Sequence, residues 1–258
     1  MIRYLVQLAY NGKKYHGWQR QINAISVQQV VEEALSRIAK TTIKISGSGR
    51  TDAGVHAICQ FAHFDFPLDI PIERFSLALI TALHTPHIRP LKFWKVPSGF
   101  NARFDAYERS YRYILTTNKT PFNVELKSYL PNHKLNPDLI RECLPLFEGT
   151  HNFIAFSKPN PDVPNTFCDL KKLNLEIDGH DYIFSITANR FLHNMVRRII
   201  GCLVTISTND LDPNLITTYL NSMTGDQRIL FTAPPNGLYL VDVKYPNENI
   251  QPVHIDSF

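Results

Sequence analysis

The chain has 258 residues, of which 44% are hydrophobic and 19% are charged, and these values are typical of an ordinary soluble globular protein of one large or two modest domains. Basic residues outnumber acidic ones by 27 to 23, so the net charge is +4 and the pI is near 8.8. This balance permits a nucleic-acid partner without requiring one. No apolar run approaches the length of a membrane span, which argues against an integral membrane protein.

The four cysteines lie far apart and form neither a C-x-x-C pair nor a zinc-binding pattern with histidines. We therefore expect buried thiols in a reducing compartment and no metal site. The first residues, MIRYLVQLAY, lack the apolar core and cleavage site of a signal peptide. The expected location is the cytoplasm, without membrane association.

The first predicted strand covers residues 3–10, where apolar and polar side chains alternate, and an Asn11-Gly12 turn follows it. Residues 15–21, YHGWQRQ, then form an aromatic and basic loop. Trp18 and Arg20 in this loop could meet an RNA base and a phosphate. Trp18 could equally be a core residue, and residue type alone does not separate the two hypotheses.

A helix is predicted to begin at Ser26, where Gln29 completes a capping box and an apolar face follows at helical spacing. Strands are expected just before the loop at residues 45–56 and again at residues 57–66 and 88–96, with a helix at residues 71–83 between the last two. The order strand, helix, strand, strand, helix, strand resembles a ferredoxin-like unit.

The loop at residues 45–56, ISGSGRTDAGVH, brackets one carboxylate, Asp52, with three glycines. Glycine serves positions where the backbone needs positive φ or a close approach. A carboxylate beside Arg50 is favoured in its ionised form and could act as a nucleophile or base. A turn-closing aspartate is the common alternative. The P-loop and dinucleotide-binding patterns both fail here.

A similar pattern begins after Pro97. Residues 108–116, ERSYRYILT, form its first predicted strand, on which Arg109, Tyr111 and Tyr113 share one face. Alternating basic and aromatic side chains suit RNA, although tyrosine is also a common strand residue. The later predicted elements are a helix at residues 137–147, a strand or loop at 149–158, a hairpin of strands 167–177 and 181–187, a helix at 211–223 and a strand at 237–243.

Residues 190–206, RFLHNMVRRIIGCLVTI, predict an amphipathic helix with a continuous apolar face. Its other side carries a polar stripe at helical spacing, formed by Arg190, His193, Asn194, Arg197 and Gly201. This stripe would hold Arg197 on a rigid element and let another chain segment come close. A solvated arginine on an outer face is the alternative.

Several of these segments resemble, in order, the motifs of the TruA family of tRNA pseudouridine synthases: GWQRQ, GRTDAGVH, RSYRY and FLHNMVRRIIG. The resemblance extends from Tyr10 to about Val243. It implies the pseudouridine synthase fold, of class α+β, in which two ferredoxin-like (RRM-like) units join into a mixed, mainly antiparallel central sheet flanked by helices. The expected boundaries are 1–104 and 105–245 for the two halves, and 246–258 for a tail.

By this resemblance Asp52 is the catalytic residue, Arg197 is its charge partner and Tyr111 is the third catalytic residue. Tyr113 stays an alternative to Tyr111 because both share a face. The candidate substrate-binding residues are Arg50, Tyr111, Trp18, Arg20, Arg103, Arg109 and His193, with Arg112 as a further phosphate contact.

The implied reaction isomerises uridine to pseudouridine in the anticodon stem-loop of tRNA, at positions 38 to 40. Uracil is cut from its sugar, turned and rejoined without oxidation, so no cofactor or metal is expected. The implied partners are tRNA and a second copy of the chain in a homodimer. Two alternatives stay open, namely a non-catalytic RNA-binding module and the same chemistry on a different RNA.

Overall fold

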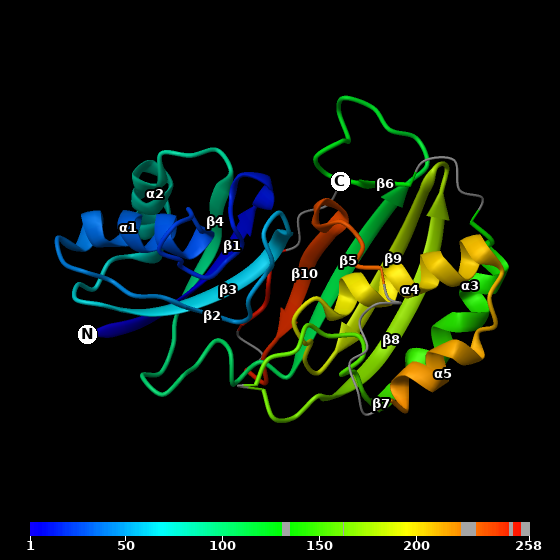
Figure 1. The fold of residues 1–258 in the computed structure, drawn as a ribbon. Coiled ribbons are helices and arrows are strands. Elements are labelled where there is room, and N and C mark those ends of the chain that lie inside the picture. Colours follow the sequence, from blue (N-terminus) through cyan, green and yellow to red (C-terminus); the bar gives the residue numbers. More distant parts are fainter. Residues whose placement is uncertain (131–134, 162, 223–230, 248–249, 254–258) are drawn as a thin grey trace. The chain divides into compact units, whose positions relative to one another are not determined.

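The computed structural model describes residues 1–130, 135–161, 163–222, 231–247 and 250–253. The chain divides into two compact units. Met1–Tyr107 together with Tyr239–Phe258 form the first, and Glu108–Leu238 form the second. In Figure 1 the first unit therefore combines the start of the chain, coloured from blue to green, with the red-orange strand β10 and the red segment that follows it.

The first unit is built on a mixed sheet of order β4-β1-β3, to which β2 and β10 add by pairing with β3. All pairs in this sheet are antiparallel except the parallel pair of β10 and β3. This order confirms the predicted ferredoxin-like arrangement. Its elements are β1 (Ile2–Tyr10), the 3-10 turn η1 (Gly12–Lys14), α1 (Val27–Ala39), β2 (Ser46–Gly47), β3 (His56–Phe66), α2 (Ile72–Leu83), β4 (Ile88–Lys95) and β10 (Leu238–Lys244).

Helices α1 and α2 pack against each other, as Figure 1 shows. The Gln29 N–H donates to Ser26 Oγ over 3.2 Å, which confirms the predicted start of α1. Phe75 of α2 is fully buried, and its ring meets the rings of Tyr4 and Phe93 on the sheet at 5.0 Å. The helices therefore cover one face of this sheet.

The chain itself covers the opposite face of the first sheet. The ring of Tyr245 lies 5.3 Å from those of both Phe61 and Phe100, and its hydroxyl donates to the carbonyl of Ala102 over 2.7 Å. Near the C-terminus, the Val253 backbone accepts from and donates to the buried Gln7 amide, both at 2.8 Å. The face that lacks helices is thus covered by Phe100, Ala102, Tyr245 and Val253 and the described residues next to them.

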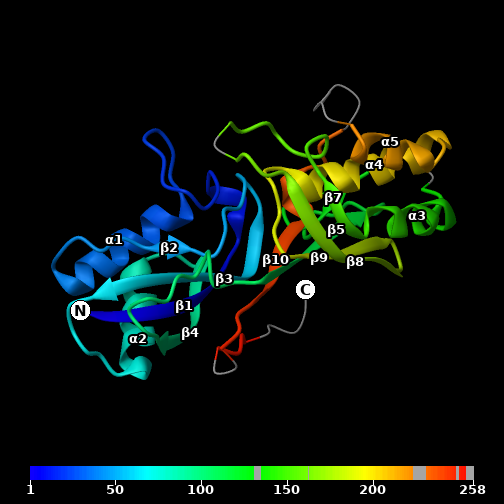
Figure 2. The same cartoon turned by 90° about the horizontal axis from the view of Figure 1, so that it is seen from below.

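The second unit has the strand order β5-β9-β8-β7, all antiparallel, with β6 parallel to β5. In Figure 2 the α-helices of this unit lie on one face of its sheet. The elements are β5 (Glu108–Thr116), β6 (Ser128–Tyr129), α3 (Pro137–Cys143), the 3-10 turn η2 (Leu144–Phe147), β7 (Gly149–Asn152), β8 (Phe167–Asp178), β9 (Asp181–Ala188), α4 (Met195–Asn209), α5 (Asn214–Leu220) and the 3-10 turn η3 (Pro235–Gly237). The α+β class and the mixed, mainly antiparallel sheets flanked by helices are confirmed.

Several predicted boundaries differ from those of the structure. The α4 helix begins at Met195 and not near Arg190, because Asn194 takes a left-handed conformation with φ 65°. The predicted helix at 137–147 changes to 3-10 geometry after Cys143, and Pro145 there has no N–H to donate.

Other elements are shorter than predicted or were not predicted. The helix predicted at 211–223 covers only Asn214–Leu220, and Met223 lies outside the described residues. The strand before the Asp52 loop is limited to the two residues of β2, and β6 was not predicted.

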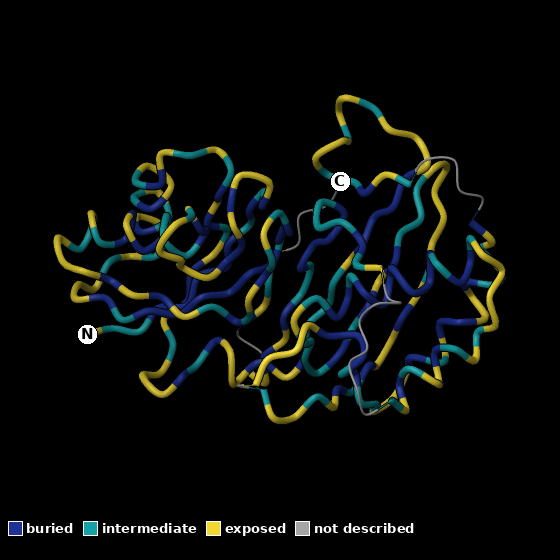
Figure 3. Tube along the Cα trace, viewed as in Figure 1, coloured by how far each residue is buried: buried dark blue, intermediate teal, exposed yellow. Residues whose placement is uncertain are grey.

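The buried positions run along the strands of both units, as Figure 3 shows. All four cysteines are buried and unpaired with one another, as predicted, and burial raises the pKa of the Cys143 and Cys168 thiols to about 11. Within the described ranges, no helix combines the length and apolar character needed to cross a membrane.

Candidate active site

Asp52 lies in the loop between β2 and β3, with its side chain half-buried. Its carbonyl accepts from the Val55 N–H over 3.1 Å, and Gly54 inside this turn has φ +79°. Glycine adopts this backbone conformation without steric cost. The sequence TDAGV therefore folds into a tight turn that presents a carboxylate at the start of a long, buried strand.

The loop that follows β1 packs directly against this turn. The Trp18 N–H donates to the Thr51 carbonyl over 3.1 Å, and the Tyr10 hydroxyl shares a 2.8 Å hydrogen bond with Thr51 Oγ1. A Cβ added to Gly17, which has φ +83°, would lie 2.5 Å from the Thr51 carbonyl oxygen. The residue before Asp52 is thus held by a backbone approach that only glycine allows.

The end of the same motif is held by His56, which is buried at the start of β3. Its Nδ1 accepts from the Gly12 N–H over 3.1 Å, so the ring proton of the neutral histidine is on Nε2. The ring stacks on Tyr239 of β10 with centroids 4.7 Å apart. The loop after β1 therefore contacts the Asp52 motif on both sides of Asp52, at Thr51 and at His56.

Trp18 is only 2% exposed. Its indole stacks on Tyr10 at 6.2 Å, and a Cβ on Gly47 would lie 2.6 Å from the indole ring atoms. A ring enclosed in this way presents no face to an RNA base, so the structure favours the core alternative for Trp18 over base stacking. Trp18 therefore stabilises the loop after β1, and the glycine at position 47 lets the backbone lie close to the indole ring.

The basic candidates of the first unit are all exposed, and Arg20 is distinguished by an ion pair with a buried carboxylate. Arg50 and Arg103 are exposed, and the Arg103 guanidinium lies 5.7 Å from the Phe104 ring centroid. Arg20 is 43% exposed and pairs over 3.1 Å with Glu32, whose side chain is only 3% exposed. Arg50 and Arg103 are therefore better placed for phosphates than Arg20, which stabilises a buried carboxylate.

In the second unit, burial separates the two candidate tyrosines of β5. Tyr111 is half-buried and meets the edge of Phe191 at 5.1 Å. Tyr113 is fully buried, its hydroxyl donates to the Pro234 carbonyl over 3.0 Å, and burial raises the pKa of this phenol. Of the two, only Tyr111 presents part of its ring at the surface of the unit.

Arg109 and Arg112 lie on opposite faces of β5. Arg109 Nη1 donates to the Asn189 carbonyl over 3.0 Å, which ties this side chain to the chain segment after β9. Arg112 is exposed. Arg112 is thus the more accessible of the two for a phosphate.

Arg197 lies in the first turn of α4 with its side chain half-buried. Its Nε donates to the Ala233 carbonyl over 2.7 Å, and its Nη1 donates to Asn194 Oδ1 over 3.2 Å. His193 is exposed, and its carbonyl accepts from the Lys158 N–H over 2.9 Å. Because α4 begins at Met195, Arg190, His193 and Asn194 precede the helix, and the predicted helical stripe is wrong for these three positions.

Gly201 of α4 does allow a close approach, as its place in the predicted stripe suggested. A Cβ there would lie 1.8 Å from the carbonyl oxygen of Phe231. The approaching segment belongs to the chain itself and includes Ala233, the acceptor of Arg197. No sequence signal identified this segment or the contact of Asn194 with Arg197 in advance.

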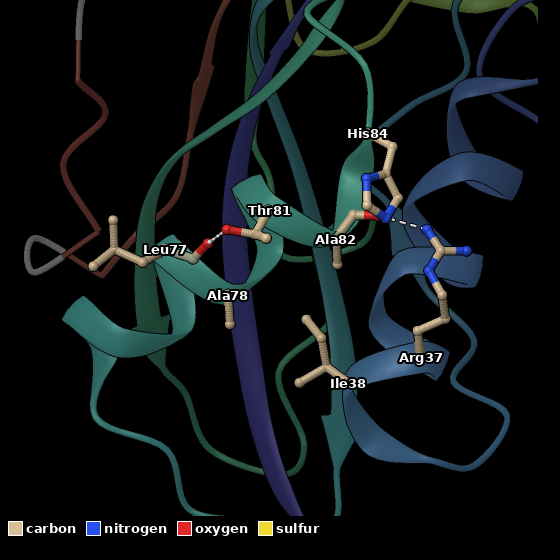
Figure 4. Close-up of a pocket in the computed structure, with 7 residues that line it drawn as sticks. All are labelled: Arg37, Ile38, Leu77, Ala78, Thr81, Ala82 and His84. Carbon is tan, nitrogen blue, oxygen red and sulfur yellow. Dashed lines mark hydrogen bonds between the residues drawn. The ribbon is translucent and has the colours of Figure 1, made fainter.

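A surface hollow between α1 and α2 lies apart from all the residues predicted for the site (Figure 4). Arg37 bridges the two helices there by donating to the Ala82 carbonyl over 2.5 Å. The residues that line this hollow are Arg37, Ile38, Leu77, Ala78, Thr81, Ala82 and His84. Across the described part of the chain, no group of three or more His, Cys, Asp or Glu side chains is arranged to hold a metal ion.

Comparisons with known proteins agree along almost the whole chain. A family model described as tRNA pseudouridine synthase matches residues 7–105 and 144–246. The tRNA pseudouridine synthase A of Porphyromonas gingivalis is 40% identical, with 96% of this chain and 99% of that protein covered. The proteins of the same name from Parabacteroides distasonis and Neorickettsia sennetsu are 38% and 37% identical, with 96% and 95% of this chain and 98% and 100% of the relatives covered.

A solved structure of a Cbf5-Nop10-Gar1 complex aligns with 78% of this chain and 54% of its own, at a TM-score of 0.34 and 10% identity, which is too distant to support an argument. The family match, in contrast, includes the Asp52 loop and α4 but not β5, and the three relatives cover 95–96% of the chain. On their strength, the chain belongs to the tRNA pseudouridine synthase family.

Proposed function

We propose that this protein isomerises uridine to pseudouridine in the anticodon stem-loop of tRNA, with Asp52 as the catalytic residue. Family membership supports the reaction and the tRNA substrate. The observation that carries the site is the half-buried carboxylate in a turn whose backbone is held by Gly12, Gly17 and Thr51. A nucleophile must be held to within a fraction of an ångström to react efficiently, and this loop supplies such a restraint.

The reaction breaks the bond between N1 of uracil and C1′ of the ribose and forms a bond between C5 and C1′. C5 loses its proton and N1 gains one, so nothing is oxidised or reduced. In the proposal, the Asp52 carboxylate attacks the sugar or the base to form a covalent intermediate, and Arg197 is the charge partner of that carboxylate. Tyr111 stacks on the uracil or helps to remove the C5 proton.

The target uridine must leave the base stack before Asp52 can reach it. The proposed contacts to the RNA backbone are the exposed arginines Arg50, Arg103 and Arg112. Arg20, Arg109 and His193 are proposed as additional contacts. Binding should accordingly weaken as the salt concentration rises. A homodimer that binds tRNA across both copies, in the cytoplasm where tRNA is modified, completes the proposal.

The test uses an unmodified tRNA transcript with tritium at C5 of its uridines and follows tritium release to water. Release is expected with the wild-type protein and should be abolished in Asp52→Asn, which keeps the shape of the side chain but removes its charge. Asp178→Asn is the control, since Asp178 is an exposed carboxylate at the turn between β8 and β9. Tritium release by Asp52→Asn at the wild-type rate would remove Asp52 from its proposed role.

The same measurement separates the alternatives. Mapping the modified uridines by primer extension identifies the positions in the tRNA, so release from another stem would correct the substrate site while keeping the chemistry. Tight tRNA binding without any release, by the wild-type protein, would favour a non-catalytic RNA-binding module instead.

A further inference from the structure

The support of Arg197 assigns a role to two residues outside the proposed reacting groups. We propose that Asn194 and Tyr113 are positioning residues for the reaction, because together they fix the direction of the Arg197 guanidinium. Asn194 does so by a direct hydrogen bond, and Tyr113 does so through the chain segment at residues 231–236. This inference rests on the role proposed above for Arg197.

Asn194 adopts a conformation that few residue types tolerate. Its φ of 65° is left-handed, and asparagine is one of the few residues other than glycine that takes this conformation at modest cost. An asparagine before a helix usually caps the first turn with its side chain, but Asn194 makes no such cap bond. Its Oδ1 accepts from Arg197 Nη1 instead, over 3.2 Å. The Asn194 side chain therefore binds Arg197 and does not cap the helix. Left-handed backbone conformations at residues other than glycine are common at functional sites.

The second support of Arg197 is the 231–236 segment. Arg197 Nε donates to the Ala233 carbonyl over 2.7 Å, and the Ala233 N–H donates back to the Arg197 carbonyl over 3.0 Å. Gly201, about one turn further along α4, lets this segment come close, since a Cβ there would lie 1.8 Å from the Phe231 carbonyl oxygen. The guanidinium is thus tied to a strip of backbone that packs on its own helix.

Tyr113 and Asn236 hold that strip of backbone in place. The Tyr113 hydroxyl donates over 3.0 Å to the carbonyl of Pro234, the residue next to Ala233. Asn236 Nδ2 donates to the carbonyls of Val124 and Lys127 over 3.0 and 2.8 Å. Because Tyr113 is fully buried, it does not touch RNA, and its bond to Pro234 is the contact through which we expect it to act on the reaction.

The geometry of an arginine side chain explains why two supports matter. A guanidinium is a planar, rigid fork, so bonds at Nε and Nη1 set the plane and the direction of the whole group. A positive charge that stabilises a carboxylate in a reacting complex acts best when it is already oriented before the charge develops. Loosening either support should therefore lower the rate of the chemical step and leave tRNA binding intact.

Asn194→Gly is the sharpest test of the first support. Glycine keeps the left-handed backbone without strain and removes only the amide that accepts from Arg197. We expect kcat for tritium release to fall about tenfold, as for the loss of one hydrogen bond to a charged group, with KM for tRNA and the Tm nearly unchanged. A raised KM with an unchanged kcat would mean that Asn194 contacts RNA, and would overturn the inference.

Tyr113→Phe tests the second support by removing one hydroxyl. The expected fall in kcat is about threefold to tenfold, again without a change in KM. Tyr182→Phe, at a half-buried tyrosine of β9, is the matched control and should keep the wild-type kcat. If Tyr113→Phe matches this control in kcat, Tyr113 is not a positioning residue.

A double-mutant cycle with Arg197→Lys decides whether both residues act through Arg197. Lysine lacks the planar fork, so neither Asn194→Gly nor Tyr113→Phe should lower kcat further in that background. If Asn194→Gly or Tyr113→Phe lowers kcat by the same factor in the Arg197→Lys background as in the wild-type protein, the effect is a general structural one and the inference is overturned. Full activity of Arg197→Lys alone would instead refute the proposed role of Arg197, which is a separate failure.

Discussion

The Asp52 loop of the first unit and the Arg197 support of the second unit are held in place by different means. Around Asp52 the restraint is backbone against backbone: added Cβ atoms on Gly12 and Gly17 would lie 1.9 and 2.5 Å from carbonyl oxygens of the motif. Around Arg197 a close backbone approach at Gly201 brings the 231–236 segment to α4, but the guanidinium itself is restrained by hydrogen bonds to Asn194 and Ala233.

This difference indicates how each region should respond to mutation. A Cβ cannot fit at 2.5 Å from a carbonyl oxygen, so the backbone itself must move, and even a 1 Å displacement of a reacting group can cost about 100-fold in rate. A lost hydrogen bond to a charged group costs only about 1.5 to 3 kcal/mol and leaves the backbone where it was. We therefore expect large losses at the glycines of the first region and graded losses at the polar residues of the second.

The largest effect is expected for Gly17→Ala. The new methyl group would meet the Thr51 carbonyl oxygen at 2.5 Å, and alanine is strained at φ +83°, so the turn before Asp52 must shift. Tritium release should fall by about 100-fold or more, together with a lower Tm. Activity within a few-fold of wild type would show that the Asp52 loop tolerates movement, and the contrast between the two regions would fail.

Gly49→Ala provides the control inside the same motif. A Cβ at Gly49 meets nothing within 4 Å, so the folded chain has room for it. The Tm should match that of the wild-type protein. A loss of activity at an unchanged Tm would show that RNA, and not the protein, needs the space beside Gly49.

The sequence predicted the aspartate region better than the arginine region, and the reason is physical. The glycines, the alternation of β1 and the motif itself are local signals, and they were sufficient to place Asp52 in a tight turn between strands. The acceptor Ala233 lies 36 residues from Arg197, in a segment without a periodic pattern. Helical spacing from Arg190 onwards also concealed the left-handed Asn194, because a periodic pattern contains no information about a single φ angle.

Trp18 is a second residue whose role the sequence alone could not decide. Aromatic and basic neighbours made base stacking and core packing equally plausible in the sequence, and only the surrounding Tyr10 and Gly47 favour the core. Composition of a loop does not reveal which of its side chains the rest of the fold will enclose. Tertiary contacts of this kind decide a residue's role after its local structure is already set.

The second effect in size is expected for Trp18→Phe, which tests this core assignment. The smaller ring leaves a cavity against Gly47, so the free energy of unfolding should fall by about 1 to 3 kcal/mol. Thermal unfolding measures this loss, and tritium release per folded molecule should fall much less than in Gly17→Ala. A weaker tRNA affinity at an unchanged Tm would return Trp18 to the role of a base-stacking residue.

The smallest effect is expected from pH, and it should separate the two units. Burial lowers the pKa of His63 below its ordinary value of 6.5, and the nearby Arg3 charge acts in the same direction. Neutral His63 is then favoured in the folded state, while the unfolded chain takes up a proton near pH 6.5. The contribution to stability is therefore complete above pH 6.5 and declines as the pH falls towards the lowered pKa of the folded state.

His63→Gln should remove this dependence, because a glutamine oxygen can replace Nδ1 as the acceptor of the Ala102 N–H but does not titrate. The measurement is the difference in unfolding free energy between wild type and variant, followed from about pH 8 to pH 5. A difference in unfolding free energy that stays constant over this range would refute the role of His63.

The groups that hold Arg197 are an amide, backbone carbonyls and a tyrosine whose pKa is raised, so the rate loss in Asn194→Gly should not change over the same range. Acid should thus weaken the unit that carries the aspartate while leaving the orientation of the arginine unchanged.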